Sequence, residues 1–446
     1  MNISAPISHV MKHASLPAII AVTFATSLHA ENWAQWRGPS FDGASSETDL
    51  VEKFSPTENV KWTTPMPGPS AATPIVWGDR VFVSTTDAQA KTLLALCLDR
   101  RSGKELWRQQ VASGFGRDNK SNFSSPSPAT DGKLVVFFYG SGELAAFDLA
   151  GKKLWERNLQ SDYGQFAFLW TFSTSPLLHG GKLYMQVLQR DKPVSGRGRT
   201  DGPNDSYLLA LNPATGKELW KQVRPADARE ESLEAFTSPV PVTHLGRSEL
   251  LVAGGDCITG HDPVSGKELW RWGTWNPEKI GSWRLVPSPV AGGGVALACG
   301  PKGASVYAVK LGKAGRLDDS AIAWKSAERD ITSDVSTPLY YQGRFYILNS
   351  DKRSLACVEP SGKVLWNAPL NSKSKIEASP TAGDGKIYVM SHSGEVFVLA
   401  AGLEFKLLHS VAMADAGERD LRSSIAISQG DLFIRTGSKL YCVGKL

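Results

Sequence analysis

Residues 210–220 read ALNPATGKELW, and close copies of this phrase recur along the chain. Residues 260–270 read GHDPVSGKELW and residues 97–107 read CLDRRSGKELW, while shorter copies occupy residues 147–155 and 358–366. In each copy a glycine lies four residues before a tryptophan. Self-similarity with a period of tens of residues is typical of an array of equivalent structural units, so this repeat predicts the fold before any other feature.

Each repeat has the same internal order of strand signals. A Ser-Pro or Thr-Pro pair opens it, a glycine-containing turn separates two apolar runs, and a Gly-Lys turn precedes a last strand that ends near tryptophan. Four antiparallel strands in roughly 40–55 residues predict one blade of a β-propeller. The openings are Thr73-Pro74, Ser127-Pro128, Ser175-Pro176, Ser238-Pro239, Ser288-Pro289, Thr337-Pro338 and Ser379-Pro380, and Ser424-Ile425 takes the eighth place.

The eighth repeat ends after three strands, and a matching fourth strand occurs at the other end of the chain. Residues 60–63, VKWT, have the character of that strand. Because an N-terminal strand would close the ring and leave no open sheet edge, we predict an all-β fold, an eight-bladed β-propeller of four-stranded antiparallel blades. Tryptophans of the last strands are expected to dock between blades, with Phe405 in that role in the seventh: Trp62, Trp107, Trp155, Trp220, Trp270, Trp324 and Trp366.

Residues 210–220 nearly reproduce the signature Ala-x-Asp-x-x-Thr-Gly-Lys-x-x-Trp. On this signature, residues 60–443 resemble the pyrroloquinoline-quinone-type (quinoprotein-like) propeller repeat family, including its BamB-like scaffold members. The resemblance implies that each tryptophan docks on the neighbouring blade and that the glycine occupies a tight turn. The fifth repeat departs from the signature, with a longer polar hairpin before Trp324.

The phrase WAQWRGP at residues 33–39 resembles a leader common in exported propellers of planctomycete-type bacteria. Two tryptophans so early in the chain need an apolar surface, so we expect them to clamp an N-terminal arm onto the propeller. A role for them in ligand binding is the alternative.

The N-terminus has the pattern of a secretory signal. Lys12 precedes the apolar run 16–25, LPAIIAVTFA, and Ala30 offers a cleavage site, with Met1 or Met11 as the start. The run is too short to span a membrane, so no transmembrane segment is predicted. We therefore divide the chain into a signal peptide (1–30), an N-terminal arm (31–59) and the propeller (60–446), and we expect a periplasmic or secreted protein.

Composition excludes several classes of protein. With 41% hydrophobic residues and a net charge of +5, the chain is globular and lacks the clustered basic residues that nucleic-acid binding requires. The five cysteines are scattered without metal-ligand spacing, so we expect small buried side chains and no metal site. A closed ring of this kind is expected to be a monomer.

The segments before each Ser-Pro pair lead into the innermost strands and therefore approach the propeller axis. Tryptophan there could stack on a planar ligand, arginine could hold an anion, and a carboxylate could bind a cation. Alternatively, these residues line a water-filled funnel and pair with one another. His392, which follows a strand end, is expected at the surface. The candidate ligand-binding residues are Trp170, Trp283, Arg284, Asp334, Glu377 and Arg422.

No assembled catalytic set is evident, because the chain lacks a phosphate-binding loop, a helical pair of metal-ligating histidines and a nucleophile elbow. We therefore expect an exported, non-catalytic binding or scaffold module for a protein, peptide or carbohydrate, with no cofactor. The alternative implied by the resemblance is a periplasmic alcohol or sugar dehydrogenase that uses pyrroloquinoline quinone (PQQ) with calcium. Many such enzymes carry two adjacent cysteines above the quinone, and this chain has none.

Overall fold

The computed structural model describes residues 1–3, 5 and 31–446. Residues 6–30, which hold the core and the cleavage site of the predicted signal peptide, lie outside the described residues. Helices are rare in the described part of the chain, which contains α1 (Leu159–Tyr163) and the 3-10 helices η1 (Glu230–Leu233) and η2 (Asp319–Ala321). None of these helices has the length and apolar character needed to cross a membrane.

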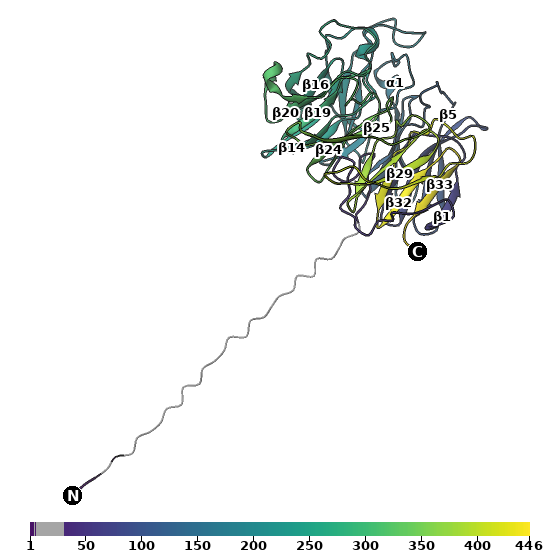
Figure 1. Ribbon diagram of the computed structural model, residues 1–446. Helices are drawn as coiled ribbons and strands as arrows, with labels where there is room; N and C mark the ends of the chain where they lie inside the picture. Colours follow the sequence, from purple (N-terminus) through teal and green to yellow (C-terminus); the bar gives the residue numbers. More distant parts are fainter. Residues whose placement is uncertain (4, 6–30) are drawn as a thin grey trace.

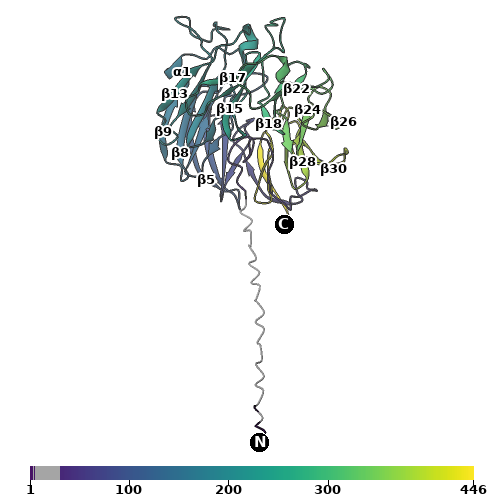
Figure 2. The same ribbon diagram turned by 90° about the vertical axis from the view of Figure 1, so that its left-hand side faces the viewer.

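The strands form eight antiparallel sheets that follow one another around a ring (Figures 1 and 2), which confirms the predicted eight-bladed propeller. Blade one contains β2 (Ile75–Trp77), β3 (Arg80–Asp87), β4 (Thr92–Asp99) and β5 (Glu105–Ser113), and blade two contains β6 (Ala129–Thr130), β7 (Leu134–Phe138), β8 (Glu143–Asp148) and β9 (Lys153–Asn158). Blade three contains β10 (Leu177–His179), β11 (Lys182–Val187), β12 (Tyr207–Leu211) and β13 (Glu218–Val223). Blade four contains β14 (Val240–His244), β15 (Arg247–Gly254), β16 (Cys257–His261) and β17 (Glu268–Trp272).

Blade five contains β18 (Val290–Gly292), β19 (Val295–Cys299), β20 (Val306–Lys310) and β22 (Ile322–Lys325), and blade six contains β23 (Leu339–Tyr341), β24 (Arg344–Asn349), β25 (Ser354–Val358) and β26 (Val364–Pro369). Blade seven contains β27 (Thr381–Gly383), β28 (Lys386–Met390), β29 (Glu395–Ala400) and β30 (Leu407–Ala412). Blade eight contains β31 (Ala426–Ser428), β32 (Asp431–Arg435), β33 (Lys439–Val443) and β1 (Val60–Pro65). The polar hairpin of blade five supplies β21 (Gly315–Arg316), which pairs in parallel with β17 as a fifth strand of blade four.

The ring closes by pairing the first strand of the chain with the last. β1 runs antiparallel to β33, with Trp62 opposite Cys442. In Figure 1 purple β1 lies beside yellow β33. Asp431 of β32 is buried and contacts the ammonium of Lys61 in β1 and the guanidinium of Arg100 in blade one. Closure therefore joins blade eight to blade one and gives blade eight its fourth, outermost strand.

The core is a set of apolar layers between neighbouring blades. One layer combines residues of blades one, seven and eight with Trp33, Leu50 and Phe54 of the N-terminal arm. Another lies between blades five and six and contains Leu297 and Phe345. All five cysteines are buried in strands and none forms a disulfide. Stability is therefore distributed around the ring, as expected where each unit packs only on its neighbours.

The tryptophan that recurs in the repeats occupies the same position in each sheet. Trp107 lies opposite Cys97, Trp220 opposite Ala210 and Trp62 opposite Cys442, in each case beside a register shift of the outer strand pair. In five turns, a Cβ atom added to the turn glycine of the next blade would lie 2.5–2.7 Å from the tryptophan side chain. The pairs are Gly103 with Trp62, Gly151 with Trp107, Gly216 with Trp155, Gly266 with Trp220 and Gly362 with Trp324. The glycine is thus required by close approach as well as by its positive φ.

Most of the indole N–H groups donate to a backbone carbonyl of the next blade. The distances are 2.7–3.2 Å, for Trp62 to Arg100, Trp107 to Leu149, Trp155 to Pro213, Trp324 to Pro360 and Trp366 to Gly402. Trp270 differs: its indole donates to the buried carboxylate of Glu249 in its own blade. The next blade, blade five, has the hairpin that carries β21 in place of the Gly-Lys turn, so the carbonyl that accepts the indole N–H elsewhere is missing.

In blade seven the expectation for Phe405 is wrong, because His409 occupies the tryptophan position. His409 lies opposite Val398, at the same register shift as the tryptophans. Its Nε2 lies 2.9 Å from the carbonyl oxygen of Phe54 in the N-terminal arm, and the two rings pack edge to face. Blade eight has no turn between its third and fourth strands, since these come from opposite ends of the chain. The arm therefore supplies the partner that a Gly-Lys turn supplies elsewhere.

The N-terminal arm crosses one end of the propeller axis. Trp33 is fully buried and forms a β-bridge with Val76 of blade one. Arg37 is 2% exposed and donates to the carbonyls of Pro338 and Pro380, which open blades six and seven, over 3.1 and 3.0 Å. Burial lowers the pKa of Arg37 to about 10, which leaves the side chain cationic at neutral pH. The arm thus closes the axis on the side opposite the candidate site.

Candidate functional site

A ring of hydroxyl groups forms the narrow part of the axial channel. In six of the eight blades the backbone N–H of the opening Ser or Thr donates to the hydroxyl of the equivalent residue in the next blade, over 2.8–3.0 Å. The following proline has no N–H, so it leaves no unpaired donor at this crowded place. The bonds run from Thr73 to Ser127, Ser127 to Ser175, Ser175 to Ser238, Ser238 to Ser288, Ser288 to Thr337 and Thr337 to Ser379.

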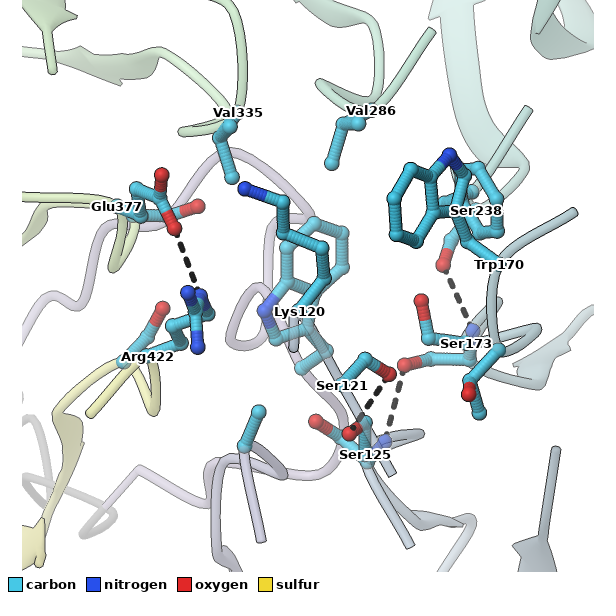
Figure 3. Close-up of a pocket in the computed structure, with 18 of the residues that line it drawn as sticks. Lys120, Ser121, Ser125, Trp170, Ser173, Ser238, Val286, Val335, Glu377 and Arg422 are labelled. Atoms are coloured by element: carbon cyan, nitrogen blue, oxygen red, sulfur yellow. Dashed lines mark hydrogen bonds and ion pairs between the residues drawn. The ribbon is translucent and has the colours of Figure 1, made fainter. Parts of the chain in front are cut away.

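A cavity of about 220 Å³ lies on this ring, and the loops before the innermost strands form its wall. Five of the six predicted ligand-binding residues line it: Trp170, Arg284, Asp334, Glu377 and Arg422. Trp283 is not among the lining residues. It is half-buried and packs against the apolar layer between blades four and five. Figure 3 shows the Glu377–Arg422 pair on one side of the cavity and the Trp170 indole on the other.

Glu377 and Arg422 form an ion pair that links the loops before blades seven and eight. Oε2 of Glu377 accepts hydrogen bonds from Nε of Arg422 over 2.7 Å and from Nε2 of His392 at 2.9 Å. Burial alone would raise the pKa of this carboxyl, but the bond to His392 and the charge of Arg422 outweigh burial and lower the pKa of Glu377 to about 2. The carboxylate is therefore ionised and has its charge satisfied within the protein.

His392 is not at the surface, contrary to the sequence-based expectation. Its side chain is 12% exposed and lies against Glu377, with Asp420 Oδ1 at 3.9 Å from Nδ1. Antiparallel pairing places the end of β28 beside the start of β27. A residue that follows β28 therefore meets the loop that precedes β27, which is the loop that carries Glu377.

Trp170 and Arg284 share a carboxylate on the other side of the cavity. The indole Nε1 of Trp170 donates to Oε1 of Glu231 over 2.9 Å, and NH1 of Arg284 lies 3.6 Å from the same oxygen. Glu231 belongs to η1, so this short helix sets the orientation of both side chains. Trp170 is half-buried and turns one face toward the cavity, where a ligand could stack on it.

Lys120 enters the cavity between these two sides, as Figure 3 shows. Its loop is held by Asp118, whose carboxylate accepts the backbone N–H groups of Lys120, Ser121 and Thr171 over 2.6–2.9 Å. Burial raises the pKa of Asp118, but these hydrogen bonds outweigh burial and lower it. Among the described residues no carboxylate lies within 4 Å of the Lys120 ammonium. The protein fixes this loop while leaving the cation available.

Asp334 and Lys375 complete the charged lining, and each has a partner outside it. Oδ1 of Asp334 accepts the backbone N–H of Lys302 over 2.8 Å, and the ammonium of Lys375 contacts Asp351 at 2.8 Å. Asp334 forms no ion pair with Arg284 or Arg422 in the described part of the chain. Five of the six predicted residues thus line one cavity, but they do not form one network.

The candidate ligand-binding residues did not include Lys120, Phe236 or Trp36, although a ligand role for Trp36 was the alternative expectation. Lys120 lies in the loop before Ser127, so the rule that selected the other loops also applied to it. Phe236 belongs to the segment before Ser238 and lines the cavity beside Trp170. Trp36 could not be placed by that rule, because it comes from the N-terminal arm and reaches the cavity along the axis. It therefore serves both as an anchor of the arm and as part of the cavity lining.

The donor groups do not fit a calcium–quinone pair. Calcium takes about six to eight oxygen ligands, usually with several carboxylates. Within residues 1–3, 5 and 31–446 no group of three or more His, Cys, Asp or Glu side chains is arranged to hold a metal ion. Of the two carboxylates that line the cavity, Glu377 is already bonded to Arg422 and His392.

Comparisons with known proteins show similarity to two kinds of propeller. A polyvinylalcohol dehydrogenase from Pseudomonas sp is 27% identical over 218 residues, which is 46% of this chain and 31% of that protein. The chain thus matches about a third of that relative's length. A europium-containing methanol dehydrogenase has a TM-score of 0.66 at 10% identity, covering 93% of this chain and 98% of that chain.

BamB from Moraxella catarrhalis has a TM-score of 0.56 at 12% identity, covering 86% of this chain and 99% of that chain. At such identities the two solved structures share the fold alone with this protein. The sequence profile of the family described as outer membrane protein assembly factor BamB matches residues 44–192, 205–323 and 312–444. These segments span nearly the whole propeller, so the chain belongs to that family.

Proposed function

We propose that this protein is an exported, non-catalytic binding or scaffold propeller whose axial cavity receives part of a protein, peptide or carbohydrate. The observation that carries the proposal is a preformed cavity with a hydroxyl-rich base, an aromatic wall and the uncompensated ammonium of Lys120. Rigid loops on a closed ring keep such a cavity open without a ligand. We expect the protein to act as a monomer in the periplasm or outside the cell.

The state of the carboxylates supports binding over catalysis. Oxidation of an alcohol needs a base within reach of the substrate hydroxyl and with a pKa near the operating pH. Glu377, with its pKa lowered to about 2 and two donors on one oxygen, is poorly suited to accept a proton. Asp334 accepts a backbone N–H from Lys302 and has no paired carboxylate beside it.

The second candidate function is a quinone-dependent alcohol or sugar dehydrogenase. It is favoured by the local identity to polyvinylalcohol dehydrogenase and by the fold shared with methanol dehydrogenase. In that case PQQ would occupy the axial cavity beside Trp170, and calcium would need Glu377 to leave its ion pair with Arg422. The two functions therefore make different demands on the same residue.

The test adds PQQ and calcium to the purified mature protein and records absorbance, melting temperature and dye-coupled oxidation of alcohols and sugars. A bound ligand at about 100 times its Kd would stabilise the fold by roughly 2.7 kcal/mol, so binding of the quinone would be visible as a rise in melting temperature. We expect no such rise and no turnover. Quinone-dependent stabilisation together with substrate oxidation would refute the non-catalytic proposal.

Binding itself is tested with oligosaccharide and peptide arrays probed by the wild-type protein and by Trp170→Ala. We expect at least one class of ligand to bind, and we expect the variant to lose that binding. The matched control is Trp155→Ala, which removes a tryptophan from the outer part of blade two and leaves the cavity intact. Equal loss in both variants would point to unfolding, and no loss in either would place binding elsewhere.

A further inference from the structure

We infer that the axial cavity and a neighbouring groove form one elongated site for a linear anionic glycan, with carboxylate or sulfate groups repeated along the chain. This inference rests on the proposed binding function and names its ligand class. It is carried by three observations: the continuity of the two cavities, the surplus of uncompensated cations and the chemistry of the walls.

The groove continues the axial cavity outward between blades eight and one. It has a volume of about 440 Å³ and lies between the loop 114–125 and the loop 413–424. Lys120, Ser121 and Arg422 line both the groove and the axial cavity. A ligand that enters the axial cavity can therefore extend into the groove without leaving the protein surface, which suits a chain and exceeds the needs of a single small molecule.

Cationic side chains outnumber carboxylates in the lining of the groove, four to three. Arg117, Lys120 and Arg419 are exposed, and none of them forms an ion pair within the described residues. Three carboxylates also line the groove. Asp118 binds backbone N–H groups and Glu418 accepts the backbone N–H of Asp415 at 3.3 Å, while Asp420 is 60% exposed and lies 3.9 Å from Arg422. The groove thus offers three exposed cations without an ion-pair partner in the described residues, which suits a ligand with several anions better than a single one.

The walls favour a sugar over an acidic peptide. Trp36, Trp170 and Phe236 present aromatic faces to the cavity, and a pyranose ring can stack its C–H face on such a surface. Serine hydroxyls that line the cavity, among them Ser121 and Ser125, can both donate to and accept from sugar hydroxyls. An extended acidic peptide would instead pair its backbone with a free strand edge. The innermost strands that surround this axis are each paired on one side and too short to offer a long edge.

Calorimetric titration of the mature protein tests the inference with four probes. These are oligogalacturonate, a sulfated galactan oligosaccharide, a neutral cello-oligosaccharide and a polyglutamate peptide. We expect one or both anionic glycans to bind at least tenfold more tightly than the neutral one, with affinity falling as salt rises. Binding of the carboxylated or of the sulfated probe identifies which anion the site selects.

Charge removal tests the groove directly. We expect Lys120→Gln and Arg419→Gln each to weaken binding of the anionic glycan by roughly five- to twentyfold, the effect of losing one charge-assisted hydrogen bond. Lys267→Gln removes the same charge from the outer rim of blade four and should leave the Kd unchanged. If Lys120→Gln and Lys267→Gln bind equally well, the inference is wrong.

The outcomes separate this inference from the proposed function. Equal affinity for the neutral sugar, preference for polyglutamate, or no binding of any glycan overturns the anionic-glycan site. The first two of these results leave a binding module in place, provided that Trp170→Ala abolishes the interaction. Turnover with added quinone, or no binding of any ligand in the arrays, both measured in the separate experiments above, contradicts the binding function itself.

Discussion

Arg422 donates from Nε to Oε2 of Glu377 over 2.7 Å, and this bond joins the loops before blades eight and seven at the mouth of the axial cavity. Both side chains are largely buried, with exposures of 15% and 10%. The pair therefore belongs to the stability of the ring as well as to the wall of the candidate site. Its energetic effect depends on pH in a direction that the lowered pKa of Glu377 determines.

Glu377→Gln should remove part of the acid sensitivity of the protein. Because the pKa of Glu377 falls from its ordinary value of 4.5 to about 2 in the folded state, the carboxylate stabilises the fold above about pH 4.5. That stabilisation, roughly 3 kcal/mol, is lost as pH falls through about 2. Melting curves from pH 2 to pH 6 should show a smaller pH dependence for the variant. Glu404→Gln, at an exposed site, is the control, and an identical slope in all three proteins would contradict this assignment.

Trp270→Phe should destabilise the protein more than Trp155→Phe. The indole of Trp270 donates to Glu249, which is 2% exposed, so its loss leaves a buried carboxylate short of a donor. We expect a cost of about 1–3 kcal/mol. Trp155 donates to the neutral backbone carbonyl of Pro213, so its loss leaves no buried charge short of a donor and should cost less. Denaturant unfolding measures both values, and equal costs would mean that Arg247 satisfies Glu249 without the indole.

Asp431→Asn should weaken the closure of the ring. The carboxylate is 1% exposed and contacts Lys61 at 2.6 Å and Arg100 at 3.0 Å, which ties β1 and blade one to blade eight. We expect the free energy of unfolding to fall by about 1–3 kcal/mol. In a double-mutant cycle with Arg100→Gln, the two changes should be non-additive by roughly 0.5–3 kcal/mol. Strict additivity would show that the contact contributes nothing to closure.

His409→Ala should release the N-terminal arm from blade seven. His409 is the only described side chain that takes the tryptophan position with a partner in the arm, through the carbonyl of Phe54. We expect faster amide exchange and earlier proteolytic cleavage in residues 50–59, with little change elsewhere. Trp366→Ala, which alters the equivalent position in blade six, should not expose the arm. Unchanged protection in His409→Ala would show that Leu50 and Phe54 hold the arm by apolar packing alone.

Much of the architecture could be predicted from the repeats, because each blade needs the same local signals. The Gly-to-Trp spacing identified five indole positions, and the strand at residues 60–63 completed blade eight as expected. Blade seven was misassigned because its turn is longer. The backbone N–H of Ala400 donates to the carbonyl of Lys406, six residues on, whereas the equivalent bond from Asn212 reaches Lys217, five residues on. The longer turn shifts the equivalent position to His409, so a fixed spacing from Gly402 does not lead to it.

The candidate site was predictable in part. Loops that precede innermost strands must reach the axis, and this rule placed Trp170, Arg284 and Glu377 at the cavity. It could not tell that Glu377 would be bonded to His392, since that contact depends on the antiparallel pairing of β27 and β28. It also could not place Trp283, whose neighbour Arg284 turns toward the cavity while the indole packs into an apolar layer.

The sequence alone determined the blade count, the closing strand and the turn glycines, because these follow from local conformational preferences repeated along the chain. Tertiary structure decided which charges remain available. Lys120 is uncompensated because Asp118, two residues away, is occupied by backbone N–H groups that include Thr171 from the next loop. Whether two charges neutralise each other depends on distances across loops from different blades, and no local pattern encodes those distances.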